Sequence, residues 1–240
     1  GQNRKIFGGE KFQCNIADPV KHQVIDILPS RNMENLCKHF LEYPYKERAA
    51  VKKIIMDLST LFRSVAKTMF PEAKIVADKF HVIRVVINSL ENVRKRIQKE
   101  FHATKRKWFK RSRYLLLKPE YKLADEDKIE LARMLNSSYD LEKAYVLKER
   151  FYEVFRKQTR TEAKKELGKW LLLAADLSLP EFRHCITTFS NWKTEIANII
   201  GERVSNGFIE GSNNKIKVLK RISYGVRNFD RFRNRILYLE

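Results

Sequence analysis

The segment AVKKIIMDLSTLFRSVAKTMFPEAKIVAD, residues 50–78, decides the fold class of this chain. Residues 50–56 and 73–77 are short, largely apolar runs that are typical of buried strands, and each run ends at an aspartate. Between them, residues 60–69 carry apolar side chains at helical spacing, and Pro71 ends the helix. The segment therefore predicts a strand, a helix and a second strand in succession.

The residues before this segment extend the sheet. Residues 10–17 and 21–28 are predicted strands, and Asp18-Pro19 is a common turn pair between them. Residues 33–43 carry apolar side chains at helical spacing. The order of these elements predicts an α/β fold, a mixed sheet with flanking helices.

The residues after the segment carry only helical signals. They predict a long helix near 80–102, an all-helical block over 104–200, and two closing helices near 206–221 and 228–238. Because the block separates the closing helices from the strands, we expect an all-helical insertion within the α/β fold. The predicted division of the chain is 1–103, 104–200 and 201–240.

The chain is strongly basic. Its 240 residues include 49 Lys and Arg against 29 Asp and Glu, a formal charge of +20. Such an excess indicates a polyanionic partner, most often nucleic acid, although a basic protein can also be merely soluble. Residues 94–113 and 215–235 hold ten and eight Lys or Arg, with one acid each, Glu100 and Asp230. Because aromatic residues are interleaved in the first run, these runs favour phosphate contact with base stacking over a solvated helix face.

The cysteine and apolar patterns argue against several classes of protein. Cys14, Cys37 and Cys185 are odd in number and form no CxxC pair. We therefore expect reduced thiols in a cytoplasmic protein, and neither a zinc site nor a disulfide framework. No apolar run approaches about 18 residues, so we expect no transmembrane helix and no signal peptide.

Two aspartates stand at the ends of predicted strands. Asp57 lies where α/β sheets place their active sites, but Asp57 or Ser59 could equally cap the next helix. Asp78 and His81 lie at a strand-to-helix junction. There, a helix N-cap with an oriented histidine is the leading interpretation, and a metal site made by this pair alone is disfavoured.

A third acid, Glu210, lies in the basic C-terminal run. The residues that share a helix face with Glu210 are Asn213, Asn214, Lys217 and Arg221. The neighbouring, mostly apolar stripe, which can pack on the sheet, consists of Ile209, Ser212, Ile216 and Leu219. Glu210 could then reach the acidic edge of the sheet, while the amides and cations face a phosphate backbone. A first-turn glutamate favoured by the helix dipole is the simpler interpretation, but it does not explain the polar row.

Carboxylates gathered from distant segments are the ligands that Mg²⁺ or Mn²⁺ prefers. Two such ions about 3.5–4 Å apart activate the attacking oxygen and stabilise the leaving oxygen in phosphodiester chemistry. That pattern normally uses three acids. The sequence offers two candidate ligands, Asp57 and Glu210.

Taken together, these features resemble the DDE transposases of bacterial insertion sequences, of the ISL-three type. The resemblance covers nearly the whole chain and is loosest in the helical block. The motifs that carry it are GGEKFQCNIADPVKHQVIDILPSR (8–31), IIMDLS (54–59), FPEAKIVADKFHV (70–82), NWKTEI (191–196) and SNGFIEGSNNKIKVLKRISYGVRNFDRFRNRIL (205–237).

The resemblance implies an RNase H-like catalytic core, formed by the first and last parts of the chain and interrupted by the helical insertion. It makes Asp57 the second catalytic acid and Glu210 the third, both as metal ligands. Asp78 and His81 match a D-x-x-H element of the family, which implies a supporting role and not a catalytic one.

One family feature is missing from this sequence. The first catalytic aspartate of such enzymes lies in an Asp-Glu pair just before the segment that begins here. Asp18 and Asp26 fall in the predicted hairpin and are not assigned that role. We therefore expect an N-terminally truncated catalytic domain.

The implied function is DNA cleavage and strand transfer at the ends of the enzyme's own element. The resemblance implies Mg²⁺ or Mn²⁺ as cofactor, double-stranded DNA as partner, a homo-oligomer on DNA and a place at the bacterial nucleoid. The predicted DNA-binding residues are Asn213, Asn214, Lys215, Lys217, Lys220 and Arg221. The alternatives are an inactive transposase fragment that only binds DNA and a basic helical scaffold that binds RNA.

Overall fold

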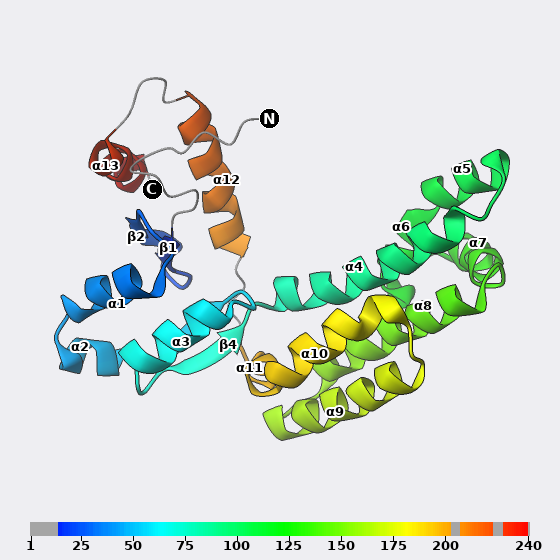
Figure 1. Cartoon of the computed structure of the whole chain (residues 1–240), viewed down its shortest axis with the longest axis horizontal. Helices are drawn as coiled ribbons and strands as arrows, with labels where there is room; N and C mark the ends of the chain where they lie inside the picture. The colour runs from blue at the N-terminus through cyan, green and yellow to red at the C-terminus, as the bar shows by residue number, and fades with distance from the viewer. Residues whose placement is uncertain (1–13, 203–206, 223–227, 240) are drawn as a thin grey trace. The chain divides into compact units, whose positions relative to one another are not determined.

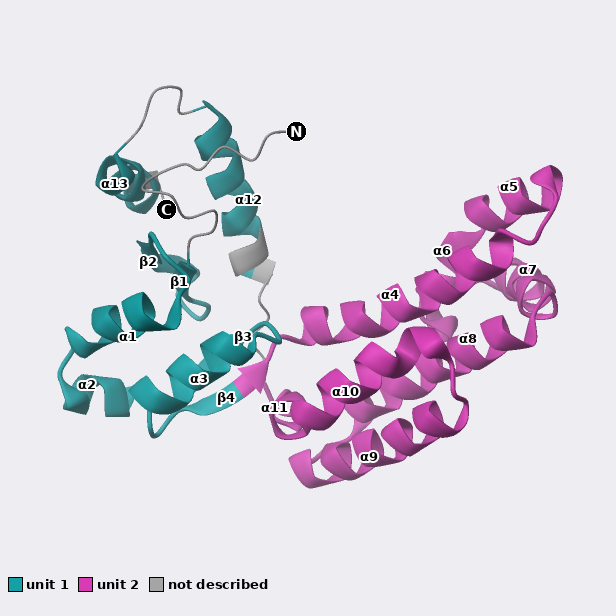
Figure 2. Ribbon diagram, in the orientation of Figure 1, with its two compact units in different colours: residues 1–75, 203–240 teal, residues 76–202 magenta. Residues whose placement is uncertain are grey.

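The computed structural model describes residues 14–202, 207–222 and 228–239, without the side chains of residues 207, 209, 210 and 239. The chain divides into two compact units (Figure 2). Unit 1 contains Gly1–Ile75 and Arg203–Glu240, and unit 2 contains Val76–Glu202. Each unit has its own buried side chains and is treated separately below.

Unit 1 begins with an antiparallel hairpin of β1 (Cys14–Asp18) and β2 (Gln23–Leu28). The side-chain Oδ1 of Asp18 accepts hydrogen bonds from the backbone N–H groups of Val20 and Lys21, at 2.8 and 3.1 Å. These bonds close the connecting turn, as aspartate commonly does. The hairpin and its turn at Asp18 are therefore confirmed.

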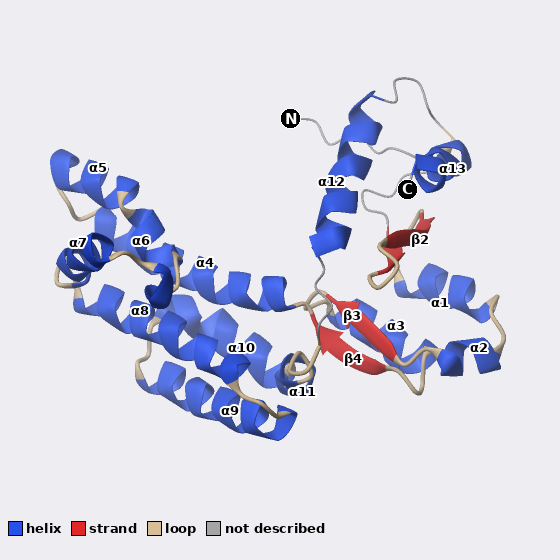
Figure 3. Ribbon diagram, turned by 180° about the vertical axis from the view of Figure 1, so that it is seen from behind, coloured by secondary structure: helices blue, strands red, loops and turns tan. Residues whose placement is uncertain are grey.

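The strand–helix–strand prediction is also confirmed. It consists of β3 (Lys53–Met56), α3 (Thr60–Met69) and β4 (Lys74–Ala77), and β3 pairs with β4 (Figure 3). Ser59 caps α3, because its side chain accepts a hydrogen bond from the backbone N–H of Phe62 at 3.3 Å.

The sequence predicts one mixed sheet, and the described strands depart from this. They form two separate two-stranded sheets, β1–β2 and β3–β4, because no ladder of backbone hydrogen bonds joins the two pairs within the described residues. The chain is thus a mixed α/β protein that is mostly helical, with small sheets (Figure 3). The RNase H-like topology stays a prediction.

Two apolar clusters hold unit 1 together. Leu28 of β2 packs with side chains of α1 (Met33–Leu41) and α3. Val24 and Ile27 of β2 pack with Phe232 and Ile236 of α13 (Phe229–Leu239), and partly buried residues of α12 (Gly207–Ile222) join them. Strand β2 therefore contributes to both clusters, and the second one binds the C-terminal helices to the hairpin.

A buried ion pair strengthens this attachment. Asp26 of β2 is 6% exposed, and its Oδ1 lies 2.5 Å from Nε of Arg233 on α13. The Nε2 atom of His39 lies 3.8 Å from the other carboxylate oxygen. Asp26 therefore holds α13 to the hairpin, which agrees with its not being assigned a catalytic role.

Unit 2 is all-helical between Lys79 and Ala197, as predicted for most of this range (Figure 1). Its helices are α4 (Lys79–Gln98), α5 (Ala103–Arg111), α6 (Arg113–Leu117), α7 (Asp125–Leu135), α8 (Tyr139–Tyr152), α9 (Arg160–Asp176), α10 (Arg183–Asn191) and α11 (Lys193–Ala197). Short 3-10 turns cover Glu120–Lys122, Glu153–Arg156 and Pro180–Phe182.

Aromatic side chains form the centre of unit 2. The ring of Phe151 lies 5.1 Å from that of Trp170 and 5.0 Å from that of Phe189, centroid to centroid. The indole N–H of Trp170 donates to the backbone oxygen of Leu147 at 2.8 Å, so the buried polar atom is satisfied. The predicted helical block thus has a core of its own.

Two element boundaries differ from the prediction. A short helix, α2 (Tyr45–Ala50), precedes β3, whereas the sequence pattern extends the strand back to residue 50. Helix α4 ends at Gln98 and α5 begins at Ala103, whereas one helix was predicted to residue 102. All three cysteines are free thiols, as predicted.

Candidate functional site

Asp57 directly follows β3, at the end of the strand. Because Ser59 caps α3, Asp57 is not needed for capping, and that alternative is resolved. The Oδ1 atom of Asp57 is buried and has no hydrogen-bond partner. A buried carboxylate oxygen without a partner is costly for a folded protein and calls for an explanation.

Asp57 also acts on the hairpin electrostatically. Burial raises the pKa of the Cys14 thiol on β1 to about 11; the charge of Arg31 opposes this rise and that of Asp57 adds to it. The Asp57 carboxylate therefore lies within electrostatic range of the start of β1.

Glu210 lies on α12 as predicted, but its side chain is outside the described residues. The inner side of α12 is defined by Ser212, which is 2% exposed, and by Ile216 and Leu219, which pack against the cluster around Val24. These three members of the predicted stripe are confirmed as the packed side. Ile209, the fourth member, has its side chain outside the described residues.

Asn213 connects α12 to the hairpin. The Nδ2 atom of Asn15 on β1 donates to Oδ1 of Asn213 at 3.2 Å. The Oδ1 atom of Asn15 is itself buried without a hydrogen-bond partner. The carbonyl oxygen of Asn213 is thus already used within unit 1, on the turn of helix that follows Glu210.

The remaining residues of the predicted DNA-binding row differ in exposure. Asn214, Lys215, Lys217 and Arg221 are exposed. The Nζ atom of Lys217 donates to Oδ1 of Asn214 at 3.5 Å, so these two side chains lie on one face as predicted. Lys220 is partly buried, and burial lowers the pKa of its amine.

Asp78 and His81 form a helix-capping pair in unit 2. One carboxylate oxygen of Asp78 accepts from the backbone N–H of Phe80 at 3.0 Å, and the other lies 2.5 Å from Nδ1 of His81. Asp78 is 4% exposed. Both of its oxygens are used inside the protein, so the structure accounts for this pair as the start of α4.

The predicted metal ligands are tested by the donors present. Within the described part of the chain, no group of three or more His, Cys, Asp or Glu side chains is placed to hold a metal ion. Of the two predicted ligands, only Asp57 has a described side chain, and its unpartnered buried oxygen fits a hard divalent cation.

The basic run 94–113 is partly internal, which its spacing did not indicate. Arg94 is 2% exposed and pairs with both oxygens of Glu91, at 2.7 and 3.2 Å. Arg96 binds Glu181 at 2.6 Å and Asp140 at 2.8 Å. These two arginines stabilise unit 2 and are not available to a polyanion.

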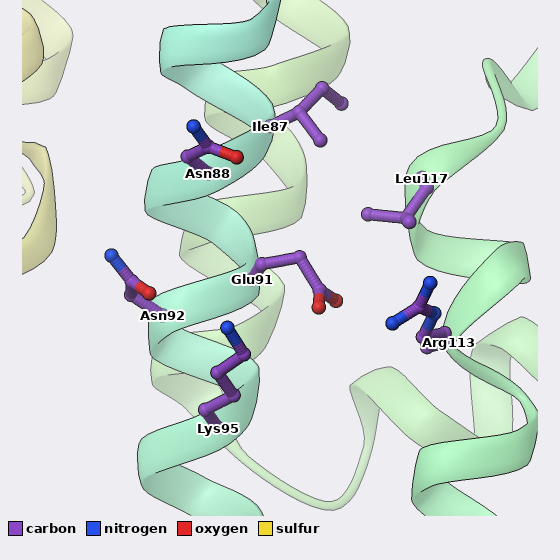
Figure 4. A pocket seen from close by; sticks show the side chains of 7 residues that line it. All are labelled: Ile87, Asn88, Glu91, Asn92, Lys95, Arg113 and Leu117. Carbon is purple, nitrogen blue, oxygen red and sulfur yellow. The ribbon is translucent and has the colours of Figure 1, made fainter. Parts of the chain in front are cut away.

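Unit 2 also contains a cavity of about 450 Å³ between α4 and α6 (Figure 4). Its lining is mixed, with the carboxylate of Glu91 directed toward the side of Arg113 and with Ile87 and Leu117 beyond them (Figure 4). It contains neither of the predicted catalytic acids. Among the described helices, none is long and apolar enough to cross a membrane.

The chain is similar to known insertion-sequence proteins. The transposase of insertion sequence element IS1001 from Bordetella parapertussis is 26% identical over 231 residues, which are 95% of this chain and 57% of the relative. The transposase of IS1557 from Mycobacterium tuberculosis is 27% identical over 206 residues, 76% of this chain and 46% of the relative. The chain thus spans about half the length of these curated relatives.

A shorter similarity carries a different name. A Lactococcus lactis protein named as an ATP-dependent protease is 36% identical over 94 residues, which are 39% of this chain and 26% of that protein. No solved structure matches the chain significantly. A family model described as a transposase, of the DDE type and the ISL-three group, matches residues 4–236. Since this match extends over nearly every residue, the chain belongs to the ISL-three family of DDE transposases.

Proposed function

We propose that this chain is the larger part of the catalytic domain of a transposase that cuts DNA and transfers strands at the ends of its insertion sequence. Membership of the family and the names of its relatives support this proposal. The observation that carries it is the Asp57 carboxylate at the end of β3, with a buried oxygen that has no partner in the protein.

In this proposal, Asp57 and Glu210 hold Mg²⁺ or Mn²⁺, and the strands belong to an RNase H-like sheet interrupted by the helical block. The bound ion supplies Lewis-acid stabilisation of the attacking and leaving oxygens of a phosphodiester. The protein contributes two oxygen donors from segments about 150 positions apart, as the numbering shows.

The exposed part of α12 is the proposed surface for double-stranded DNA. Lys215, Lys217 and Arg221 are exposed cations that can neutralise phosphates, and Asn214 can donate a hydrogen bond to a phosphate oxygen. Lys220 and Asn213 belong to the same row, but part of each side chain serves unit 1. A homo-oligomer on paired DNA ends, located at the nucleoid, completes the proposal.

The proposed division keeps residues 1–103 and 201–240 in the catalytic core and 104–200 in the insertion. Asp78 and His81 then support the core by fixing the start of α4. This assigns them a positioning role, since neither oxygen of Asp78 is left for a metal ion.

The test uses the complete transposase with Asp57→Asn and Glu210→Gln, assayed for Mg²⁺-dependent cleavage of a DNA end. Both variants should lose cleavage, at least 100-fold, and bind DNA within a few-fold of the wild type, because each removes one ligand charge and little volume. Glu126→Gln, at an exposed glutamate of α7, is the matched control and should cleave normally. Cleavage that survives either substitution at the site would disprove the assignment.

A second candidate function is DNA binding without catalysis. The observation that favours it is that the described residues contain no cluster of three carboxylates. Its signature is steeply salt-dependent duplex binding with no cleavage by the complete protein in Mg²⁺ or Mn²⁺.

A further inference from the structure

Helix α5 presents a cationic face on unit 2. Its exposed residues include Arg106, Lys107, Lys110 and Arg111, whereas Phe109 on the opposite side is fully buried. The helix, ATKRKWFKR, contains no acid. Positive charge therefore covers the outer side of α5 without interruption.

These four cations are not used inside the protein. None of them has an ion pair or a hydrogen bond to a side chain among the residues that the structure describes. Arg94 and Arg96 of the same run are, in contrast, each paired with acids. The structure thus separates the run into a paired part on α4 and an unpaired part on α5.

The aromatic residues near α5 are already occupied. The indole N–H of Trp108 donates to Glu130, and the Tyr114 hydroxyl donates to Asp127 at 3.2 Å. The Phe109 ring contacts that of Phe101 edge-on, with centroids 5.1 Å apart. Single-strand binding uses free aromatic platforms, so the surroundings of α5 favour a duplex, in contrast to the base stacking expected from the sequence.

We propose that the outer face of α5 is a second binding surface for duplex DNA, which contacts the phosphate backbone without reading sequence. This inference rests on the proposed function for the identity of the polyanion. Arg106 and Lys107 lie one helical turn before Lys110 and Arg111, about 6 Å along the axis. A DNA strand carries a phosphate about every 3.4 Å of its axis, so the two pairs can contact different phosphates.

The surroundings of α5 support a backbone ligand. Lys95 and Arg113 are exposed cations that line the nearby cavity and add to the positive charge of unit 2 (Figure 4). A membrane surface fits less well, because an interfacial helix inserts its apolar side, and here that side holds the fully buried Phe109.

The test is the variant Arg106→Gln, Lys107→Gln, Lys110→Gln and Arg111→Gln in the full chain. Its binding to a fluorescent 30-base-pair duplex of arbitrary sequence is measured by anisotropy between 50 and 200 mM NaCl, without divalent metal. The matched control removes four cations that each have an acidic partner: Arg133, Arg156, Arg160 and Lys169, all changed to Gln. Circular dichroism establishes that both variants are folded.

The α5 variant should lower the slope of log K against log salt by about 3 to 4, at roughly 0.9 per phosphate. Over this salt range the wild type should lose about 100-fold more affinity than the variant does. The control should change the slope by less than about 1. Because the assay contains no metal, it gives a result even if the proposed cleavage activity fails.

An unchanged slope in the folded α5 variant would overturn the proposal. So would an equal loss in the control, because bulk charge would then explain the effect. Competition with single strands of equal length, and binding to anionic phosphatidylserine vesicles, cover the other polyanions. A defect seen only with either of these would assign the face to that ligand and not to duplex DNA.

Discussion

Replacing Asp57 should make the metal-free protein more stable while it destroys the proposed site. The buried Oδ1 atom of Asp57 has no hydrogen-bond partner, and such a group costs about 1–3 kcal/mol, more when charged. Asp57→Asn removes the charge at constant shape, and Asp57→Ala removes the group. We expect a gain of about 1 kcal/mol in unfolding free energy for Asp57→Asn, or about 2–4 °C in midpoint for a chain of this size.

Divalent metal should reverse this order of stability. Mg²⁺ or Mn²⁺ bound at Asp57 stabilises only the folded wild type, by about 2.7 kcal/mol at 100 times the dissociation constant. The two Asp57 variants should show no metal-dependent rise in midpoint. They are then the more stable proteins in EDTA and the less stable ones in excess metal, as expected for a site that trades stability for function.

Cys14 offers a second readout that does not depend on metal. Burial raises the pKa of its thiol to about 11, and the Asp57 charge contributes to the rise. The thiol of Asp57→Asn should therefore titrate at lower pH and react faster with a thiol reagent at fixed pH. Unchanged titration would show that the carboxylate is farther from β1 than the structure places it.

The assays are thermal melts in EDTA and in a Mg²⁺ or Mn²⁺ series. Glu126→Gln, an exposed acid on α7, serves as the control and should stay within about 0.5 kcal/mol of the wild type. The reasoning is refuted if Asp57→Asn is less stable than the wild type in EDTA, or if it keeps the full metal-dependent shift.

Three further predictions concern the contacts that position the site. Asp78→Ala should cost about 2 kcal/mol, because it removes both the cap of α4 and the contact with His81, and Asp78→Ser should recover about 1 kcal/mol by restoring the cap. Arg233→Met should cost about 2 kcal/mol in chemical denaturation, since it leaves the carboxylate of Asp26 buried without its main partner. Backbone hydrogen bonds lower the pKa of Asp18, so its contribution to stability is complete above the unfolded value of about 3.9 and is lost as pH falls through the lower folded value. Asp18→Asn should therefore flatten the dependence of the melting midpoint on pH below about 4.

Each of these predictions has an outcome that contradicts it. Equal stability of Asp78→Ser and Asp78→Ala would show that the cap contributes nothing. Arg231→Met, at an exposed arginine of α13, is the control for Arg233→Met, and equal losses would remove the ion pair as the cause. An unaltered acid profile in Asp18→Asn would mean that the turn bonds do not favour the ionised carboxylate.

The sequence predicted the elements whose pattern is strong. The hairpin, α3, α13 and the helical block all have apolar spacing that matches their buried sides. Helix α2 was missed because none of its six residues is buried, so it has no apolar periodicity to detect. Its signal is Pro44 before a run of good helix formers, and the strand pattern of residues 50–56 outweighed it.

Long-range pairing explains what the charge pattern could not predict. Arg96 reads as one more cation in a basic run, yet its partners Asp140 and Glu181 lie 44 and 85 positions away. Spacing rules describe neighbours on one helix and contain no information about such partners. The division of the basic run into internal and available cations therefore required the structure.

The same limit applies to the polar row on α12, where it changes the interpretation of the site. The row was predicted as a single DNA-binding face, but Asn213 accepts a hydrogen bond from Asn15, 198 positions away. Asn213 therefore contributes to the placement of α12 on the hairpin, one turn after Glu210, while the exposed Asn214, Lys217 and Arg221 are available to DNA. One helix can then serve two purposes, because its inner edge fixes the height of the catalytic glutamate and its outer edge holds the strand that this glutamate acts on. This division explains why a lone carboxylate stands in a basic run: its neighbours on the helix bind the substrate's charge, and the carboxylate binds the metal.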